Sequence, residues 1–198
     1  MTSSQPRAAV LISGEGTNLQ ALIDAAAAKT LGAEIVCVVS NRLAARGLDR
    51  ARAASVAAVH VGAVKGEARE DYDARLAAAL KPYHPDFLVL AGFMRIFSAG
   101  FVESFAGRML NIHPSLLPAY PGLDTHRRVL EAGETWHGAT VHFVTAELDA
   151  GPAIVQYRLR VRPDDTVETL AARVHAGEHA ILPKAVSLLA GGRLRLVD

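Results

Sequence analysis

The sequence has very little cysteine, since Cys37 is the only one among 198 residues. A single cysteine excludes an intramolecular disulfide framework and a zinc site built on cysteines. Long apolar runs are missing too, because no segment approaches the roughly 20 residues that cross a membrane. The apolar stretch 8–12 is too short for the core of a signal peptide. We therefore expect a cytoplasmic protein without a membrane partner.

An excess of one charge sign is also absent. The 21 basic residues are balanced by 20 acidic residues, which gives a formal net charge of +1. A surface for duplex nucleic acid needs a basic excess, so we expect no nucleic-acid partner, although a local site for one phosphate needs no global charge. With 51% hydrophobic and 21% charged residues, a chain of this length can bury a core without disulfides or metal. We expect one domain, residues 1–198.

Short apolar runs alternate with helical patterns along the first 110 residues. The runs predict buried strands at 8–12, 34–39, 57–61, 87–90 and 108–112, with helices at 18–29, 45–54 and 70–80. This alternation is typical of βαβ units and of a parallel sheet covered on both faces. Farther on, the pattern predicts an antiparallel hairpin (140–144 and 154–161), a helix from about 166 to 190 and an edge strand at 193–197. The prediction is an α/β fold, a single-domain Rossmann-like open twisted sheet that is mostly parallel with an antiparallel C-terminal extension and helices on both faces.

A glycine loop, residues 13–18 (SGEGTN), joins the first predicted strand to the first helix. Its glycines permit a tight turn, and the free N–H groups at a helix start favour an anion. The loop matches a dinucleotide-binding motif only in part, because Leu19 takes the place of the third glycine. The alternative is a plain turn in which Thr17 or Asn18 caps the helix.

Polar side chains suited to acyl chemistry follow the fifth predicted strand. Asn111 and His113 are two residues apart on an extended segment, so they point to the same side. An amide beside an imidazole can polarise a carbonyl and handle a proton. Asp149 could orient His113 and stabilise its cationic form. The alternatives are a structural histidine and an ordinary Asp-x-Gly-Pro turn.

Two further segments carry candidate residues. The sequence HAGEH at 175–179 matches the H-x-x-E-H pattern of zinc proteases, but the third ligand is missing because no Glu follows Glu178. We therefore expect no metal. The segment 92–97 (GFMRIF) follows the fourth strand and could contact a flat aromatic ligand, or pack against the next helix.

Taken together and in this order, these segments resemble the phosphoribosylglycinamide formyltransferase family. The matching stretches cover nearly the whole chain and include LISGEGTNLQALID, VVSNR, VLAGFMRIFS, NIHPSLLPAYPGL, HGATVHFVTAELDAGPAIVQ and ARVHAGEHAILP. The resemblance implies formyl transfer from 10-formyltetrahydrofolate, a co-substrate, to the amine of glycinamide ribonucleotide in purine synthesis. It implies no metal.

The resemblance also implies roles for individual residues. The catalytic trio would be Asn111, His113 and Asp149. The ribonucleotide would contact Gly16, Thr17, Asn18, His175, Ala176, Gly177 and Glu178. The folate would contact Arg69, Met94, Arg95, Ile96, Phe97, Asn111, Thr145, Ala146, Glu147, Leu148 and Asp149. The nucleotide-binding half would span about residues 1–110 and the catalytic and folate half about residues 111–198. Asp124 departs from the family, because some relatives carry a histidine there.

Three alternatives remain to be weighed. A formyltetrahydrofolate deformylase would carry an extra N-terminal domain, whereas the first strand here begins within ten residues of Met1. A methionyl-tRNA formyltransferase would add a C-terminal nucleic-acid-binding domain and a basic surface. A non-catalytic nucleotide-binding module would have no reason to combine Asn111, His113 and Asp149. The deformylase-like hydrolase is the alternative we retain, and we expect a monomer or a homodimer.

Overall fold

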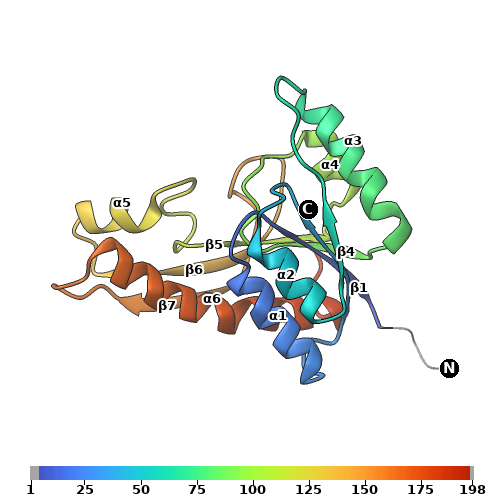
Figure 1. The fold of residues 1–198 in the computed structure, drawn as a ribbon. Coiled ribbons are helices and arrows are strands. Elements are labelled where there is room, and N and C mark those ends of the chain that lie inside the picture. Colours follow the sequence, from blue (N-terminus) through green and yellow to red (C-terminus); the bar gives the residue numbers. More distant parts are fainter. Residues whose placement is uncertain (1–4, 197–198) are drawn as a thin grey trace.

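The fold is organised around one seven-stranded sheet with the strand order β3-β2-β1-β4-β5-β6-β7 (Figure 1). The computed structural model describes residues 5–196. The strands are β1 (Arg7–Ile12), β2 (Glu34–Ser40), β3 (Ala57–His60), β4 (Phe87–Leu90), β5 (Met109–His113), β6 (Trp136–Phe143) and β7 (Ala153–Arg160). Strands β1 to β5 are parallel, and β6 and β7 are antiparallel. The predicted fold class is confirmed.

Helices cover both faces of the sheet, which is why the central strands are apolar without alternation. Along β1, Val10 and Ile12 belong to one buried cluster, and Ala9 and Leu11 to the other. The first cluster packs under helices on one face, namely α1 (Thr17–Ala27), α2 (Arg46–Ala53), α5 (Thr125–Glu131) and α6 (Val167–Ala190). The second packs under α3 (Arg69–Leu80), which is followed by the short 3-10 helix η1 (Lys81–Tyr83), and under α4 (Ala99–Ser104) (Figure 1).

Most predicted boundaries lie within two residues of the structure, and two predictions differ more. Strand β6 begins at Trp136, four residues before the predicted start, because Gly138 weakens the strand pattern although the fold needs it. A Cβ at Gly138 would collide with the main-chain carbonyl of Tyr157 on the neighbouring strand. The predicted edge strand at 193–197 does not form over 193–196, where Leu194 and Leu196 pack against the core as a loop, and Val197 lies outside the described residues.

The strand order places a crevice beside the carboxyl ends of β1 and β4. The chain runs outward from β1 to β3 and then returns to β4 on the other side of β1. Ligands of open α/β sheets bind at such a switch point, outside the carboxyl ends of the strands. The glycine loop follows β1, the segment 91–98 follows β4, and His113 ends β5. All three therefore lie at one edge of the sheet.

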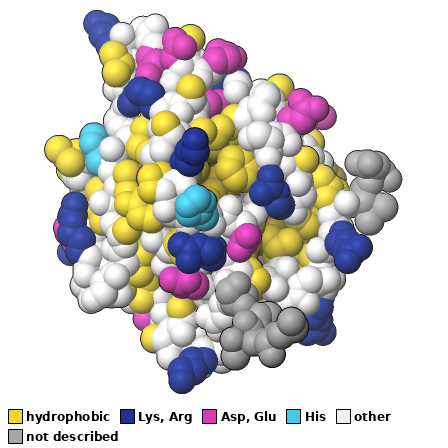
Figure 2. Space-filling view, turned by 90° about the vertical axis from the view of Figure 1, so that its right-hand side faces the viewer, with side chains coloured by type: hydrophobic (Ala, Val, Ile, Leu, Met, Phe, Trp, Pro, Cys, Tyr) yellow, Lys and Arg dark blue, Asp and Glu magenta, His cyan; other side chains and the backbone are white. Residues whose placement is uncertain are grey.

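The surface shown in Figure 2 carries basic and acidic side chains interspersed with apolar patches. No field of one sign gathers on that face, in keeping with the net charge of +1. Within residues 5–196, none of the helices combines the length and the apolar character that a membrane crossing requires.

Candidate active site

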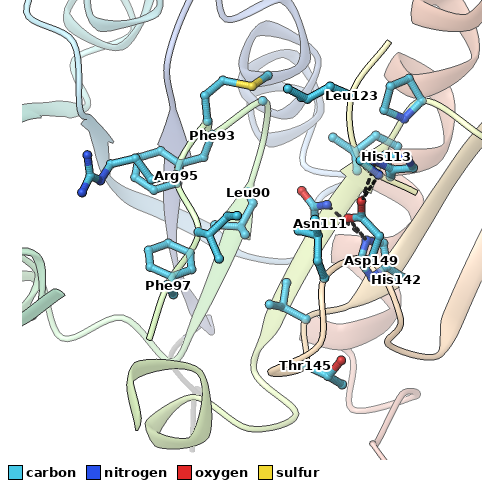
Figure 3. A pocket seen from close by; sticks show the side chains of 18 of the residues that line it. Leu90, Phe93, Arg95, Phe97, Asn111, His113, Leu123, His142, Thr145 and Asp149 are labelled. Carbon is cyan, nitrogen blue, oxygen red and sulfur yellow. Dashed lines mark hydrogen bonds and ion pairs between the residues drawn. The ribbon is translucent and has the colours of Figure 1, made fainter. Parts of the chain in front are cut away.

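A cavity of about 510 Å³ opens at this edge of the sheet. Its lining comes from four stretches of chain, within 90–102, 111–114, 122–126 and 142–149. Figure 3 shows the side chains of Asn111, His113, His142 and Asp149 gathered on one side of the cavity, and those of Leu90, Phe97 and Arg95 on the other. A mainly apolar pocket with a few convergent polar groups is the usual form of a small-molecule site.

Asn111 is oriented by a histidine on the neighbouring strand. It pairs with His142 across β5 and β6, and the side-chain nitrogens Asn111 Nδ2 and His142 Nε2 are 3.1 Å apart. The other ring nitrogen, His142 Nδ1, donates to the carbonyl of Phe143 at 2.8 Å, so Nε2 accepts from the Asn111 amide. Burial lowers the pKa of His142 and keeps the ring neutral in this role. The second N–H of Asn111 remains for a ligand oxygen.

His113 faces the carboxylate of Asp149. Their atoms Nδ1 and Oδ2 are 3.4 Å apart, and each side chain is only 7% exposed. The opposite nitrogen of the ring, Nε2, donates to the carbonyl of Tyr120 at 2.9 Å. Asp149 fixes the orientation of the ring, and a ring N–H aimed into the cavity can donate to a developing oxyanion. A substrate oxygen that accepts from Nε2 has to replace the Tyr120 carbonyl.

Asp149 reaches this position through the path of its loop. The loop between β6 and β7 begins at the far end of β5, where the amide of Val144 donates to the carbonyl of Met109. It then folds back over the sheet, and Asp149 adopts a positive φ of 54°. The carboxylate also accepts from the amide of Gly122 at 2.9 Å. Asp149 is therefore held by two separate loops beside His113.

The structure brings together all but one of the residues expected to contact the folate. Met94, Arg95, Ile96, Phe97, Asn111, Thr145, Ala146, Glu147, Leu148 and Asp149 all line the cavity. Arg69 does not line it, and instead donates to the carbonyl of Phe97 at 3.5 Å. Several apolar side chains at the cavity are exposed, including Met94 (61%) and Leu123 (75%). Exposed apolar surface of this kind marks an interaction site.

The residues expected at the ribonucleotide form a second group. Asn18 Nδ2 donates to Glu178 Oε2 at 2.8 Å although the two residues are 160 positions apart, and both side chains are buried. His175 Nε2 lies 3.9 Å from the same oxygen. Residues 16–18 and 175–178 are thus brought together, beside a smaller cavity of about 300 Å³ that Thr17 lines.

The interpretation of Thr17 or Asn18 as the cap of α1 was wrong. Gly16 takes the N-cap position with a φ of 72°, and no side chain of the described residues caps this helix. A Cβ at Gly16 would lie 2.7 Å from the Cα of Gly47, so α2 packs directly on the loop. The first amides of α1 are left to a solvent or ligand acceptor.

Comparison with known proteins identifies the family of the chain. Residues 6–186 match the sequence model of the family described as formyl transferase. The phosphoribosylglycinamide formyltransferase of Escherichia coli (strain K12) is 51% identical over 94% of this chain and 88% of its own length. The chain belongs to the formyl transferase family. The solved phosphoribosylglycinamide formyltransferase of Coxiella burnetii, in complex with CHES, shares 50% identity over 98% of this chain and 92% of its own, with a TM-score of 0.92.

A solved formyltetrahydrofolate deformylase is a more distant member of the same fold. The protein from Pseudomonas syringae pv. tomato shares 27% identity with this formyl transferase chain, with a TM-score of 0.91. The match covers 99% of this chain and 65% of the deformylase. The transferases of Escherichia coli and Coxiella burnetii are therefore much closer in sequence than this hydrolase, and the expected resemblance is confirmed.

Sequence reasoning missed three histidines of the site. His137 and His142 are an odd number of positions apart on a predicted strand, which excluded them as a metal pair but gave them no other role; the position of His142 opposite Asn111 follows once the hairpin register is known. His126, which lines the cavity, forms a hydrogen-bonded pair with His137 at 2.9 Å between Nδ1 and Nε2. Burial lowers the pKa of both, that of His137 to about 4. Periodicity carries no signal for such a pair, because α5 and β6 meet only in the folded chain.

The zinc-like pattern at 175–179 is not assembled as a metal site. Glu178 accepts from Asn18, and the buried Nε2 atom of His179 has no hydrogen-bond partner among the atoms of residues 5–196. Among residues 5–196, no three His, Cys, Asp or Glu side chains are grouped to hold a metal ion.

Proposed function

We propose that this chain transfers the formyl group of 10-formyltetrahydrofolate to the amine of 5'-phosphoribosylglycinamide, in purine biosynthesis. The products are N-formylglycinamide ribonucleotide and tetrahydrofolate. The observation that supports this most directly is the cluster of Asn111, His113 and Asp149 at the polar side of an apolar cavity. The similarity to phosphoribosylglycinamide formyltransferases over most of the chain supports the same reaction.

The proposed chemistry is the attack of a neutral amine on the formyl carbon. The carbon becomes tetrahedral, and its oxygen gains negative charge. That oxygen would accept from the free N–H of Asn111 and from the Nε2–H of His113, whose ring Asp149 orients. No covalent enzyme intermediate and no metal are needed.

A proton must then move from the attacking amine to the leaving folate nitrogen. Two routes fit the cluster. In the first, His113 accepts and returns the proton. In the second, a water held by Asp149 does so. Both routes depend on the pair of His113 and Asp149, whose atoms Nδ1 and Oδ2 are 3.4 Å apart, so both predict that each residue is needed for turnover.

The two groups of residues suggest the two substrate positions. We propose that the folate occupies the cavity of about 510 Å³ against residues 94–97 and 145–149, with Arg69 behind them. The ribonucleotide would bind at residues 16–18 and 175–178, with its phosphate at the free amides of α1 and its ribose at Glu178. In this proposal residues 1–198 form one domain that needs both halves. The cytoplasmic location, and the choice between monomer and homodimer, stay predictions.

A deformylase-like hydrolase is the second candidate, because the same cluster could direct water at the formyl carbon. The joined Asn18 and Glu178 favour the transferase, since a hydrolase of formyl folate has no ribonucleotide to hold. One assay separates them. Purified protein is given the formyl folate with and without glycinamide ribonucleotide, and both products are measured. Release of tetrahydrofolate that needs the ribonucleotide supports the transferase, whereas release without it supports the hydrolase.

A further inference from the structure

The cavity wall between β4 and α4 has no regular secondary structure of its own. We call residues 93–98 the wall segment. Five of its six residues line the cavity, yet no strand or helix holds them there. At one end, the amide of Met94 donates to Ser13 Oγ at 2.8 Å. The other end is held by α3, through contacts that the catalytic chemistry does not use.

Asp73 makes the main contact at that end. Its carboxylate accepts from the amide of Ser98 at 2.6 Å, at the residue that caps α4. The side chain is buried, at 3% exposure, and its second oxygen has no partner among the described atoms. A buried carboxylate with one unused oxygen is costly to keep. The packing of α3 does not require a carboxylate at position 73, since a small apolar side chain could fill the same place.

Two neighbours of Asp73 on α3 contact the same segment. Residues at i, i+3 and i+4 share one face of a helix, and Arg69, Tyr72 and Asp73 have this spacing. Arg69 donates to the carbonyl of Phe97. The guanidinium of Arg95 lies 3.9 Å from the centre of the Tyr72 ring, a cation–π distance. The N-terminal part of α3 therefore contacts the wall segment at three residues, Arg95, Phe97 and Ser98.

We propose that Asp73 is a positioning residue for formyl folate binding. It touches no substrate, but fixes the wall segment at the distance and orientation that a flat ligand needs. The inference rests on the proposed function, because it takes the large cavity to be the folate site. The inference predicts that loss of Asp73 weakens the binding of one substrate, the formyl folate, and not of the other. Loss of Asp73 loosens the folate side of the cavity, whereas the cluster around His113 and the residues near Glu178 keep their own contacts.

The test is a steady-state comparison of Asp73→Ala and Asp73→Asn. The alanine variant loses the acceptor for Ser98, and we expect KM for the formyl folate to rise about tenfold, with KM for the ribonucleotide and kcat within about twofold of wild type. Asparagine keeps one acceptor oxygen, so this variant should recover most of the folate affinity. Asp71→Asn, an exposed position on the same helix, is the matched control and should change neither KM.

A purely structural role would give a different result. If Asp73 only stabilises the fold, Asp73→Ala lowers the amount of active enzyme and the apparent kcat, while both KM values stay unchanged. That outcome, or an equal rise of both KM values, overturns the inference. Thermal unfolding of each variant shows whether the protein is folded under the assay conditions. If the alanine variant does not fold, Asp73→Asn is compared with Asp71→Asn instead. The inference then requires that Asp73→Asn shows a small rise in KM for the formyl folate and none for the ribonucleotide, and that Asp71→Asn shows neither.

A cavity variant separates this inference from the proposed site. Leu148 is exposed at the cavity, so Leu148→Arg should fold normally and obstruct the ligand. If Leu148→Arg raises KM for the formyl folate and Asp73→Ala does not, the inference about Asp73 fails alone. If Leu148→Arg leaves that KM unchanged, the large cavity is not the folate site, and the proposed placement fails as well.

Discussion

The paired histidines behind the cavity should make the stability of this protein fall in mild acid. His137 is 1% exposed, and burial lowers its pKa from the ordinary value of 6.5 to about 4. The folded state therefore binds fewer protons than the unfolded state at any pH between these values. Stability is full above pH 6.5, and it is lost progressively as the pH falls from 6.5 toward 4.

The size of the effect follows from the two pKa values. At about pH 5 the unfolded histidine is almost fully protonated and the folded one almost fully neutral, so His137 alone removes about 2 kcal/mol of unfolding free energy. At about pH 7.5 its contribution is close to zero by the same relation. His126 and His142 also have lowered pKa values and add to the loss in the same direction.

The variant His137→Gln tests this reasoning. It cannot titrate, but it loses the hydrogen bond to His126, so at about pH 7.5 it should be less stable than wild type by about 1 kcal/mol. At about pH 5 that difference should disappear or reverse. Only the wild type has a residue 137 that binds a proton in the unfolded state and not in the folded state, which lowers its unfolding free energy by about 2 kcal/mol. Urea unfolding followed by circular dichroism at both pH values gives the free energies.

His60→Gln is the matched control for this measurement. His60 is exposed at the edge strand β3, and its replacement should leave the pH dependence of stability as in the wild type. The reasoning is refuted if His137→Gln and wild type lose equal stability between the two pH values. Equal losses would mean that folding does not keep His137 neutral.

Three further outcomes can be checked. His113→Ala and Asp149→Ala should each lower kcat by about two to four orders of magnitude, with circular dichroism and unfolding curves showing an intact fold; wild-type turnover in either would contradict the proposed mechanism. Gly177→Ala places a Cβ inside the ring of Tyr157, so thermal unfolding should show a loss of about 1–3 kcal/mol, and an unchanged melting temperature would show that the ring moves freely. Ser13→Ala removes the hydroxyl that joins the glycine loop to the wall segment, so KM should rise for both substrates, and a rise for one alone would contradict that link.

Much of the fold was predictable because its signals are local in sequence. The strand β4 (Phe87–Leu90) was predicted to the residue, since a short apolar run between prolines and a glycine has few other interpretations. Helix α6 was predicted from its acidic start and its double-glycine end. Strand β6 was cut short because Gly138 weakens the local pattern, and its requirement for glycine arises only from the approach of Tyr157. The site was predicted less completely, because His142, the pair of His126 and His137, and Asp73 have roles that depend on contacts between distant segments.

The sequence by itself determined the α/β fold class, the glycine turn after β1 and the identity of the residues able to do acyl chemistry. These follow from periodicity, turn residues and side-chain chemistry, all of which act over a few positions. Only the tertiary structure decided which of them meet. Asp149 contacts His113 because its loop folds back over β5 from the opposite end, and Asn18 contacts Glu178 across 160 positions of chain. Such contacts are set by strand register and loop path, which depend on the packing of the whole chain.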